Sequence, residues 1–218
     1  MTMDAVLLLH GLGRTRLSMA LPSRWLSRAG FHTINLGYPS RRGDVDGSAA
    51  FVAARLPPPE QRPPRLHVLT HSMGGVVFRR LHTIAPIAGL GRVVMLSPPN
   101  RGSRLARKLG RFHPYRWILG PAITDLGGGW PALEPLLGRI DFDLGVITGE
   151  ARRYQAYGAL LPEPSDGKVE VGETEIDGMK DFLVVPSAHT FIMNRREVLE
   201  QAEHFFRHGR FSAVSSGE

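Results

Sequence analysis

The chain has 218 residues, 42% hydrophobic and 22% charged, which is enough to bury the core of one soluble globular domain. It contains no cysteine, which excludes disulfides and thiolate metal sites and fits a reducing compartment. The formal charge of +7 comes from basic residues spread along the chain, with no compact basic run interleaved with aromatic residues. We therefore expect a solvated basic surface and no nucleic-acid partner, while a transient contact with an anionic membrane surface stays open.

The first predicted element is the apolar run at residues 5–9. An acidic residue precedes it and no basic segment does, and five residues are too few for a signal-peptide core or a membrane span. We interpret the run as a strand and expect a cytoplasmic protein.

Strands and helices alternate through the first hundred residues. A continuous apolar run, which is typical of a strand buried on both faces, predicts a strand at residues 5–9. Further strands are predicted at residues 31–36, 66–70 and 92–96. Helical spacing predicts helices at residues 18–29, 47–56 (with Ser48 as N-cap) and 75–85. This alternation predicts a doubly wound, mostly parallel α/β sheet.

Residues 101–139 break this regularity. A helix is predicted at residues 103–109, but the glycine run 127–129 and scattered proline and tryptophan residues favour irregular structure. We expect a short insertion or lid here. Its aromatic residues form either a satellite core or the wall of an apolar substrate pocket, and both interpretations stay open.

The remaining elements complete one domain, residues 1–218. Strands are predicted at residues 142–148 and 181–185, a loop or irregular edge at 152–163, and an amphipathic helix at 194–208. The small, polar segment 212–218 is expected to be disordered.

Residues 66–77 carry the strongest chemical signal: an apolar strand, an abrupt turn with Ser72 at its tip, and the start of a helix. Gly74 and Gly75 follow the serine and allow close packing of the two elements. Such a turn exposes the hydroxyl beside a helix N-terminus, which suits a nucleophile. The alternative is that Ser72 merely caps the helix.

Four motifs resemble those of the α/β-hydrolase superfamily, in its small serine lipase/esterase branch. They are T-H-S-M-G at residues 70–74, H-G-L-G at 10–13, S-D-G-K-V at 165–169 and A-H at 188–189. They stand in the family's chain order, and the elbow is also similar to that of GPI-inositol-deacylase-like proteins. One departure is Thr70, where the family's elbow commonly has glycine.

The resemblance implies a role for each motif. Ser72 is the nucleophile, His189 the general base, and Asp166 the residue that orients the imidazole. The backbone N–H groups of Leu12 and Met73 are the expected oxyanion hole.

Alternatives exist for the acid. Asp166 lies in Ser-Asp-Gly, where aspartate also favours turns for its own sake. The fallback carboxylates are Asp141, Asp143, Asp177 and Asp181.

Further site residues are assigned around these. His10, Gly11, Trp117 and Trp130 are candidate substrate contacts, whereas His71 is expected to point away from the site. Arg14 either adds charge near the oxyanion loop or lies on the surface. No metal-binding or phosphate-binding motif is present, so we expect chemistry without a metal or cofactor.

The leading hypothesis is a serine esterase or lipase acting on a small-molecule or lipid ester. The alternatives are a lipid-anchor deacylase, a thioesterase or an acyltransferase with the same triad, or a non-catalytic binding protein of the same fold. The ester, its acyl-chain length and the oligomeric state cannot be read from the sequence.

Overall fold

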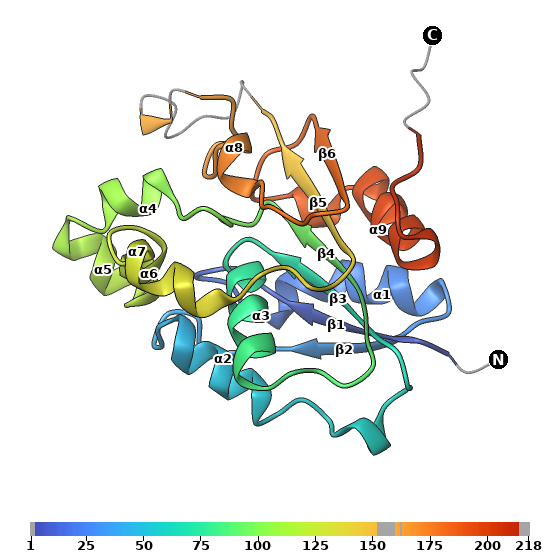
Figure 1. Ribbon diagram of the computed structural model, residues 1–218. Coiled ribbons are helices and arrows are strands. Elements are labelled where there is room, and N and C mark those ends of the chain that lie inside the picture. Colours follow the sequence, from blue (N-terminus) through green and yellow to red (C-terminus); the bar gives the residue numbers. More distant parts are fainter. Residues whose placement is uncertain (1–2, 152–159, 162, 214–218) are drawn as a thin grey trace, which may run out of the picture.

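A parallel β-sheet is the centre of the computed structural model, which describes residues 3–151, 160–161 and 163–213. Its strands are β1 (Ala5–Leu9), β2 (His32–Leu36), β3 (Leu66–His71), β4 (Leu90–Leu96), β5 (Leu144–Gly149) and β6 (Asp181–Val185). They lie in the order β2-β1-β3-β4-β5-β6, and every neighbouring pair is parallel. The predicted doubly wound sheet is confirmed (Figure 1).

Helices cover both faces of the sheet. On one face α1 (Ala20–Arg28) and α9 (Arg196–His208) pack over alternate strand residues, and on the other lie α2 (Val45–Ala53) and α3 (Met73–Ile84). Because both faces are buried, the strands are apolar at successive positions, with Leu8 in one core and Leu9 in the other.

The strand order places a crevice between β1 and β3. The chain leaves β1 to form β2 on one side and then returns to form β3 on the other. In such open sheets, ligands bind beyond the carboxyl ends of the strands at the point where the order reverses. The loops after β1 and β3 therefore meet at the place where a site is expected.

Helix α2 begins differently from its prediction. Its N-cap is Asp44, whose side chain accepts a hydrogen bond from the N–H of Gly47, rather than Ser48, which is buried inside the helix. An aspartate is an equally good cap, and it starts the helix two residues earlier. Short 3₁₀ turns flank other elements: η1 (Arg16–Met19), η2 (Pro59–Gln61), η3 (Glu134–Leu137) and η5 (Ile192–Asn194).

Residues 101–139 hold more helix than predicted. They form α4 (Arg104–Leu109), α5 (His113–Leu119), α6 (Ala122–Leu126) and α7 (Trp130–Leu133). Glycine or proline stands at or just after the end of each of these four helices, so each has only one or two turns and the helical period is hidden in the sequence. The region lies as one group beside the sheet (Figure 1). Outside this region, the short helix α8 (Val171–Thr174) follows β5.

Two predicted segments lie largely outside the described residues. Of the loop at 152–163 only 160, 161 and 163 are described, and the predicted tail is described only to residue 213. The start of that tail is ordered, because the main-chain N–H and C=O of Ser212 both bond to the side chain of Gln201. Among the described residues, no helix has the length and apolar character needed to cross a bilayer.

Candidate active site

The turn between β3 and α3 holds Ser72 in a strained conformation. Its φ is 54° and its ψ is −127°, a region that residues with side chains rarely adopt. The N–H of Ser72 donates to the carbonyl of Leu96 on the neighbouring strand, at 2.8 Å. The turn is therefore tied to the sheet directly before the helix begins.

Glycines allow this turn to form. A Cβ at Gly74 would lie 2.7 Å from the carbonyl oxygen of Leu9, so α3 can approach the end of β1 only with glycine there. A Cβ at Gly75 would lie 3.3 Å from the hydroxyl of Thr70, which is fully buried. Gly75 therefore leaves room beside the side chain of Thr70, the residue that departs from the common elbow pattern.

The loop after β1 runs directly beside the serine. A Cβ at Gly11 would lie 3.0 Å from the Cβ of Ser72, and the next residue, Leu12, lines the same cavity as Ser72. Met73 is the first residue of α3, where N–H groups have no partner within the helix. Both sequence-predicted oxyanion residues thus flank Ser72, although their function as N–H donors stays a prediction.

His10 does not reach the cavity, which corrects its assignment as a substrate contact. The side chain is fully buried, stacks on Tyr38 at 4.3 Å, and accepts the N–H of that tyrosine through Nε2. The Nδ1–H of His10 donates to the carbonyl of Gly11, and the Tyr38 hydroxyl donates to the carbonyl of His10. His10 therefore fixes the shape of the loop beside Ser72.

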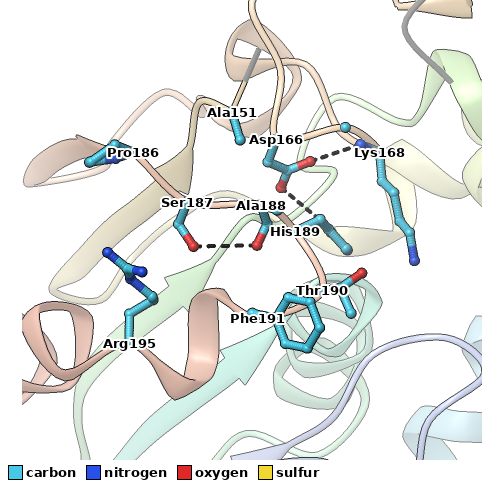
Figure 2. Close-up of a pocket in the computed structure, with 11 residues that line it drawn as sticks. Ala151, Asp166, Lys168, Pro186, Ser187, Ala188, His189, Thr190, Phe191 and Arg195 are labelled. Atoms are coloured by element: carbon cyan, nitrogen blue, oxygen red, sulfur yellow. Dashed lines mark hydrogen bonds and ion pairs between the residues drawn. The ribbon is translucent and has the colours of Figure 1, made fainter. Parts of the chain in front are cut away.

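Asp166 and His189 lie in contact, as Figure 2 shows. The Nδ1 of His189 is 2.6 Å from Oδ2 of Asp166, and both side chains are buried. Because an ionised carboxylate only accepts hydrogen bonds, Nδ1 carries the proton and Nε2 presents its lone pair. This is the tautomer that a general base requires.

The backbone holds the carboxylate in place. Oδ1 of Asp166 accepts the N–H groups of Lys168 and Val169, and the carbonyl of Asp166 accepts the N–H of His189. Burial raises the pKa of Asp166, but the charge of His189 and the hydrogen bonds from His189 and from the N–H of Val169 lower it, and the net pKa lies below its usual value. A Cβ at Gly149 would lie 2.9 Å from the Cβ of Asp166. The loop that carries Asp166 can therefore pack against the end of β5 only because residue 149 is glycine.

The fallback carboxylates lie elsewhere. Each comes just before β5 or at or before the start of β6, at the amino ends of the strands and away from the site: Asp141, Asp143, Asp177 and Asp181. Of these, Asp143 forms ion pairs with Arg92 and Lys180, and Asp181 accepts the N–H of Phe211.

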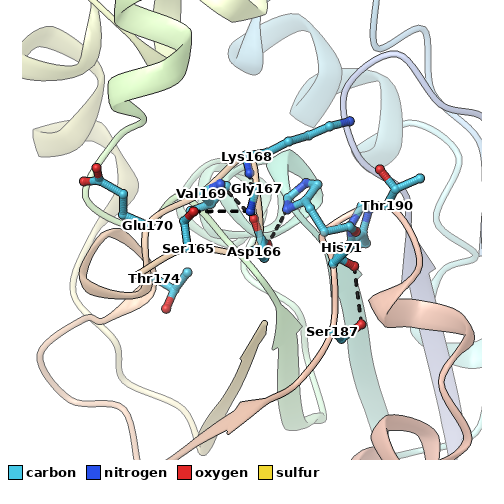
Figure 3. A network of polar contacts seen from close by, with 12 residues as sticks. His71, Ser165, Asp166, Gly167, Lys168, Val169, Glu170, Thr174, Ser187 and Thr190 are labelled. Atoms are coloured by element: carbon cyan, nitrogen blue, oxygen red, sulfur yellow. Dashed lines mark hydrogen bonds and ion pairs between the residues drawn. The ribbon is translucent and has the colours of Figure 1, made fainter. Parts of the chain in front are cut away.

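His71 contacts the candidate base, contrary to the sequence expectation that it points away. Figure 3 shows His71 among the polar residues around Asp166. The ring of His71 lies 4.8 Å from that of His189, and its Nε2–H donates to the carbonyl of His189 at 3.0 Å. Burial, followed by the charges of His189 and Arg14, lowers the pKa of His71 well below its ordinary value. A neutral His71 thus holds the loop that carries His189.

A cavity of about 190 Å³, which we call the Ser72 cavity, joins these parts. Ser72, His71 and His189 line it together with Arg14 and Lys168. The cavity also has an aliphatic wall from α4, α5 and α6: Leu105, Ala106, Leu109, Leu119, Ile123 and Leu126. Sequence reasoning did not place Lys168 here, because its only signal is its position two residues after Asp166.

The two tryptophans assigned to substrate binding lie outside the Ser72 cavity. Trp130 is buried in the core, where a Cβ at Gly102 would lie 2.8 Å from its ring, and Trp117 is 88% exposed on α5. Residues 101–139 supply a wall of the cavity, but through aliphatic rather than aromatic side chains. Within the described part of the chain, no cluster of three or more histidine and carboxylate side chains is arranged to hold a metal.

Comparisons with known proteins give the same fold. A model of the alpha/beta hydrolase family matches residues 6–205. The fold is similar to lipase BlEst2 of Bacillus licheniformis, with a TM-score of 0.65 and 17% identity over 88% of this chain and 87% of that one. It is also similar to the type II thioesterase BorB from the borrelidin biosynthetic cluster, with a TM-score of 0.58 and 14% identity over 94% and 92% of the two chains.

A third similar structure is phospholipase PlaB of Legionella pneumophila, with a TM-score of 0.68 and 20% identity. The match covers 94% of this chain but 57% of PlaB, so the chain spans little more than half of that protein. No curated protein matches the sequence. At these identities the likeness concerns the fold alone.

Proposed function

Since the chain belongs to the alpha/beta hydrolase family, we propose that it is a serine hydrolase that cleaves carboxylic esters through an acyl-enzyme on Ser72. One observation carries the proposal. Ser72 and His189 line the same cavity, and His189 is bound through Nδ1 to a buried carboxylate. A serine hydroxyl needs such a base to accept its proton as it attacks.

The reaction has two halves. Ser72 Oγ bonds to the ester carbonyl carbon while its proton passes to Nε2 of His189, and the carbonyl oxygen becomes an oxyanion. The C–O bond to the alcohol then breaks, and His189 returns the proton to the leaving alkoxide. Water attacks the acyl-enzyme in the same way, with His189 as base, and releases the acid and free Ser72. The N–H groups of Leu12 and Met73 are the proposed donors to the oxyanion.

Related chemistry remains in competition with ester hydrolysis. A lipid-anchor deacylase, a thioesterase or an acyltransferase would use the same triad, and a binding protein would keep the fold without reacting. The aliphatic wall of the Ser72 cavity supports an acyl substrate. Contact with a membrane surface and a cytoplasmic location stay predictions. Contact with a membrane surface is supported by the exposed side chains of Trp117 on α5 and of Phe112 directly before that helix.

Ser72→Ala tests the proposal. We expect the variant to lose hydrolysis of 4-nitrophenyl esters by at least about a thousand-fold, because the nucleophile is gone. It should also fail to react with a fluorophosphonate probe, whereas its unfolding midpoint stays near that of the wild type. Ser27→Ala, an exposed serine on α1, is the matched control and should keep full activity. Full activity of Ser72→Ala would refute the assignment.

A further inference from the structure

The charged side chains around the catalytic residues are cations that lack carboxylate partners. Arg14 and Lys168 both line the Ser72 cavity, and in the part of the chain that the structure describes no aspartate or glutamate does. Among the described residues neither forms an ion pair with a carboxylate, whereas Arg195 nearby is paired with Glu197. A basic pair without acidic partners, at the wall of a cavity, is suited to an anion from outside the chain.

The two cations flank the loop of His189. Arg14 donates to the carbonyl of Thr190 at 3.1 Å, which uses one donor of its guanidinium. Lys168 reaches along the side chain of His189 from the acid loop (Figure 2). Burial and the charge of Arg14 lower the pKa of Lys168, while Asp166 opposes this effect, so the two cations feel each other across the site.

A second cavity continues from this point. We call it the outer hollow; it has a volume of about 530 Å³, and it shares Lys168 and His189 with the Ser72 cavity. Thr190 and Arg195 also line it, and Asp166, the acidic residue that lines it among those described, is already bound to His189. Lys168 therefore stands where the two cavities meet.

The chemistry of the triad places the two parts of the substrate beside different residues of the site. His189 gives its proton to the leaving oxygen, so the alcohol of the ester must lie on the His189 side. The acyl group then lies against the aliphatic wall formed by α4, α5 and α6. We propose that the enzyme acts on esters whose alcohol part carries an anionic group, a phosphate or a carboxylate, held by Lys168 and Arg14. This inference rests on the proposed function and names its substrate class.

Paired substrates test the inference. The first pair is 3-octanoyloxy-4-nitrobenzoate and 2-nitrophenyl octanoate, which differ by one carboxylate on the leaving group. The second pair is 1-octanoylglycerol 3-phosphate and 1-octanoylglycerol, which differ by a phosphate. The measured quantity is the ratio of kcat/KM for the anionic ester to kcat/KM for its neutral partner. We expect a ratio of about ten or more in at least one pair, and the pair with the larger ratio identifies the anion.

Lys168→Gln should lower this ratio about ten-fold, because it removes the charge but keeps the main-chain N–H that holds Asp166. Arg14→Gln should lower it in the same direction. The matched control is Lys180→Gln, which removes the same charge at the amino end of β6 and should leave the ratio unchanged. Raising the salt concentration from about 0.02 M to about 0.5 M should lower this ratio for the wild type, because salt screens charges. A site that recognised the alcohol part without charge would show no such dependence on salt.

The two proposals fail in different ways. If hydrolysis depends on Ser72 but neither pair shows a preference for the anionic ester, the inference about the alcohol is wrong and the esterase assignment stands. The inference also fails if Lys168→Gln and Arg14→Gln lower both members of a pair equally. If no ester of either pair is hydrolysed in a Ser72-dependent way, the proposed function itself fails.

Discussion

At the scale of single residues, the candidate site depends on a histidine with no chemical step of its own. His71 donates to the main-chain carbonyl of His189, and its ring packs on the ring of His189. It is the last residue of β3 and precedes Ser72, so one segment of chain positions both the nucleophile and the loop of the base. We therefore regard His71 as a positioning residue.

Replacing His71 with phenylalanine keeps an aromatic ring but removes the donor to the buried carbonyl of His189. A lost partner of this kind costs about 1–3 kcal/mol. We expect kcat/KM to fall about ten-fold, together with the rate constant for labelling of Ser72 by a fluorophosphonate. His71→Gln, which retains an N–H donor, should recover part of both. Wild-type rates in the phenylalanine variant would show that His71 only fills space.

At the scale of elements, the sheet was predictable because short stretches rich in apolar residues alternate with helical patterns along the chain. Residues 5–9 and 181–185 were predicted with the bounds that the structure has, since short apolar runs of this kind are typical of strands in a parallel sheet. Within residues 101–139 the helix at 103–109 was predicted and is α4, whereas α5, α6 and α7 were missed. Their one or two turns are too short to display a period of 3.6 residues.

The same contrast holds for the site. Ser72, Asp166 and His189 were predicted because motif and chain order mark them, and the structure brings Asp166 and His189 into contact. Long-range packing decides the remaining roles. Arg14 meets the loop of His189 only through the folded chain, because the two partners of its hydrogen bond are 176 positions apart in the sequence. No local pattern reports such a contact.

The contact between α3 and the end of β1 gives a test at this scale. Gly74→Ala would place a methyl group 2.7 Å from the carbonyl oxygen of Leu9 and 2.8 Å from that of His10. We expect a loss of about 1–3 kcal/mol in the free energy of unfolding, although alanine is favoured within helices by about 1 kcal/mol. Gly172→Ala in α8 is the control, since its Cβ meets nothing within 4 Å. Equal urea midpoints for the two variants would contradict the packing argument.

At the scale of the whole molecule, buried histidines couple the fold to pH. His10, His67 and His71 all have a pKa below the ordinary value, and burial is the largest cause in each. Below about pH 6.5 the unfolded chain binds protons at these positions that the folded chain does not. Stability is therefore fully present above that pH, and it falls as the pH drops toward the lowered pKa values.

This coupling predicts an acid-sensitive fold. For each histidine that stays neutral in the folded state, the free energy of unfolding falls by up to about 1.4 kcal/mol per pH unit below about pH 6.5. We expect the free energy of unfolding in urea to be about 1–3 kcal/mol lower at about pH 5.5 than at about pH 7.5. His71→Phe should remove about 1 kcal/mol of that difference, because burial, and after it the charges of His189 and Arg14, oppose protonation of His71. Exposed His113→Phe should leave the difference unchanged. Equal stability of the wild type at the two pH values would show that the buried histidines accept protons without unfolding.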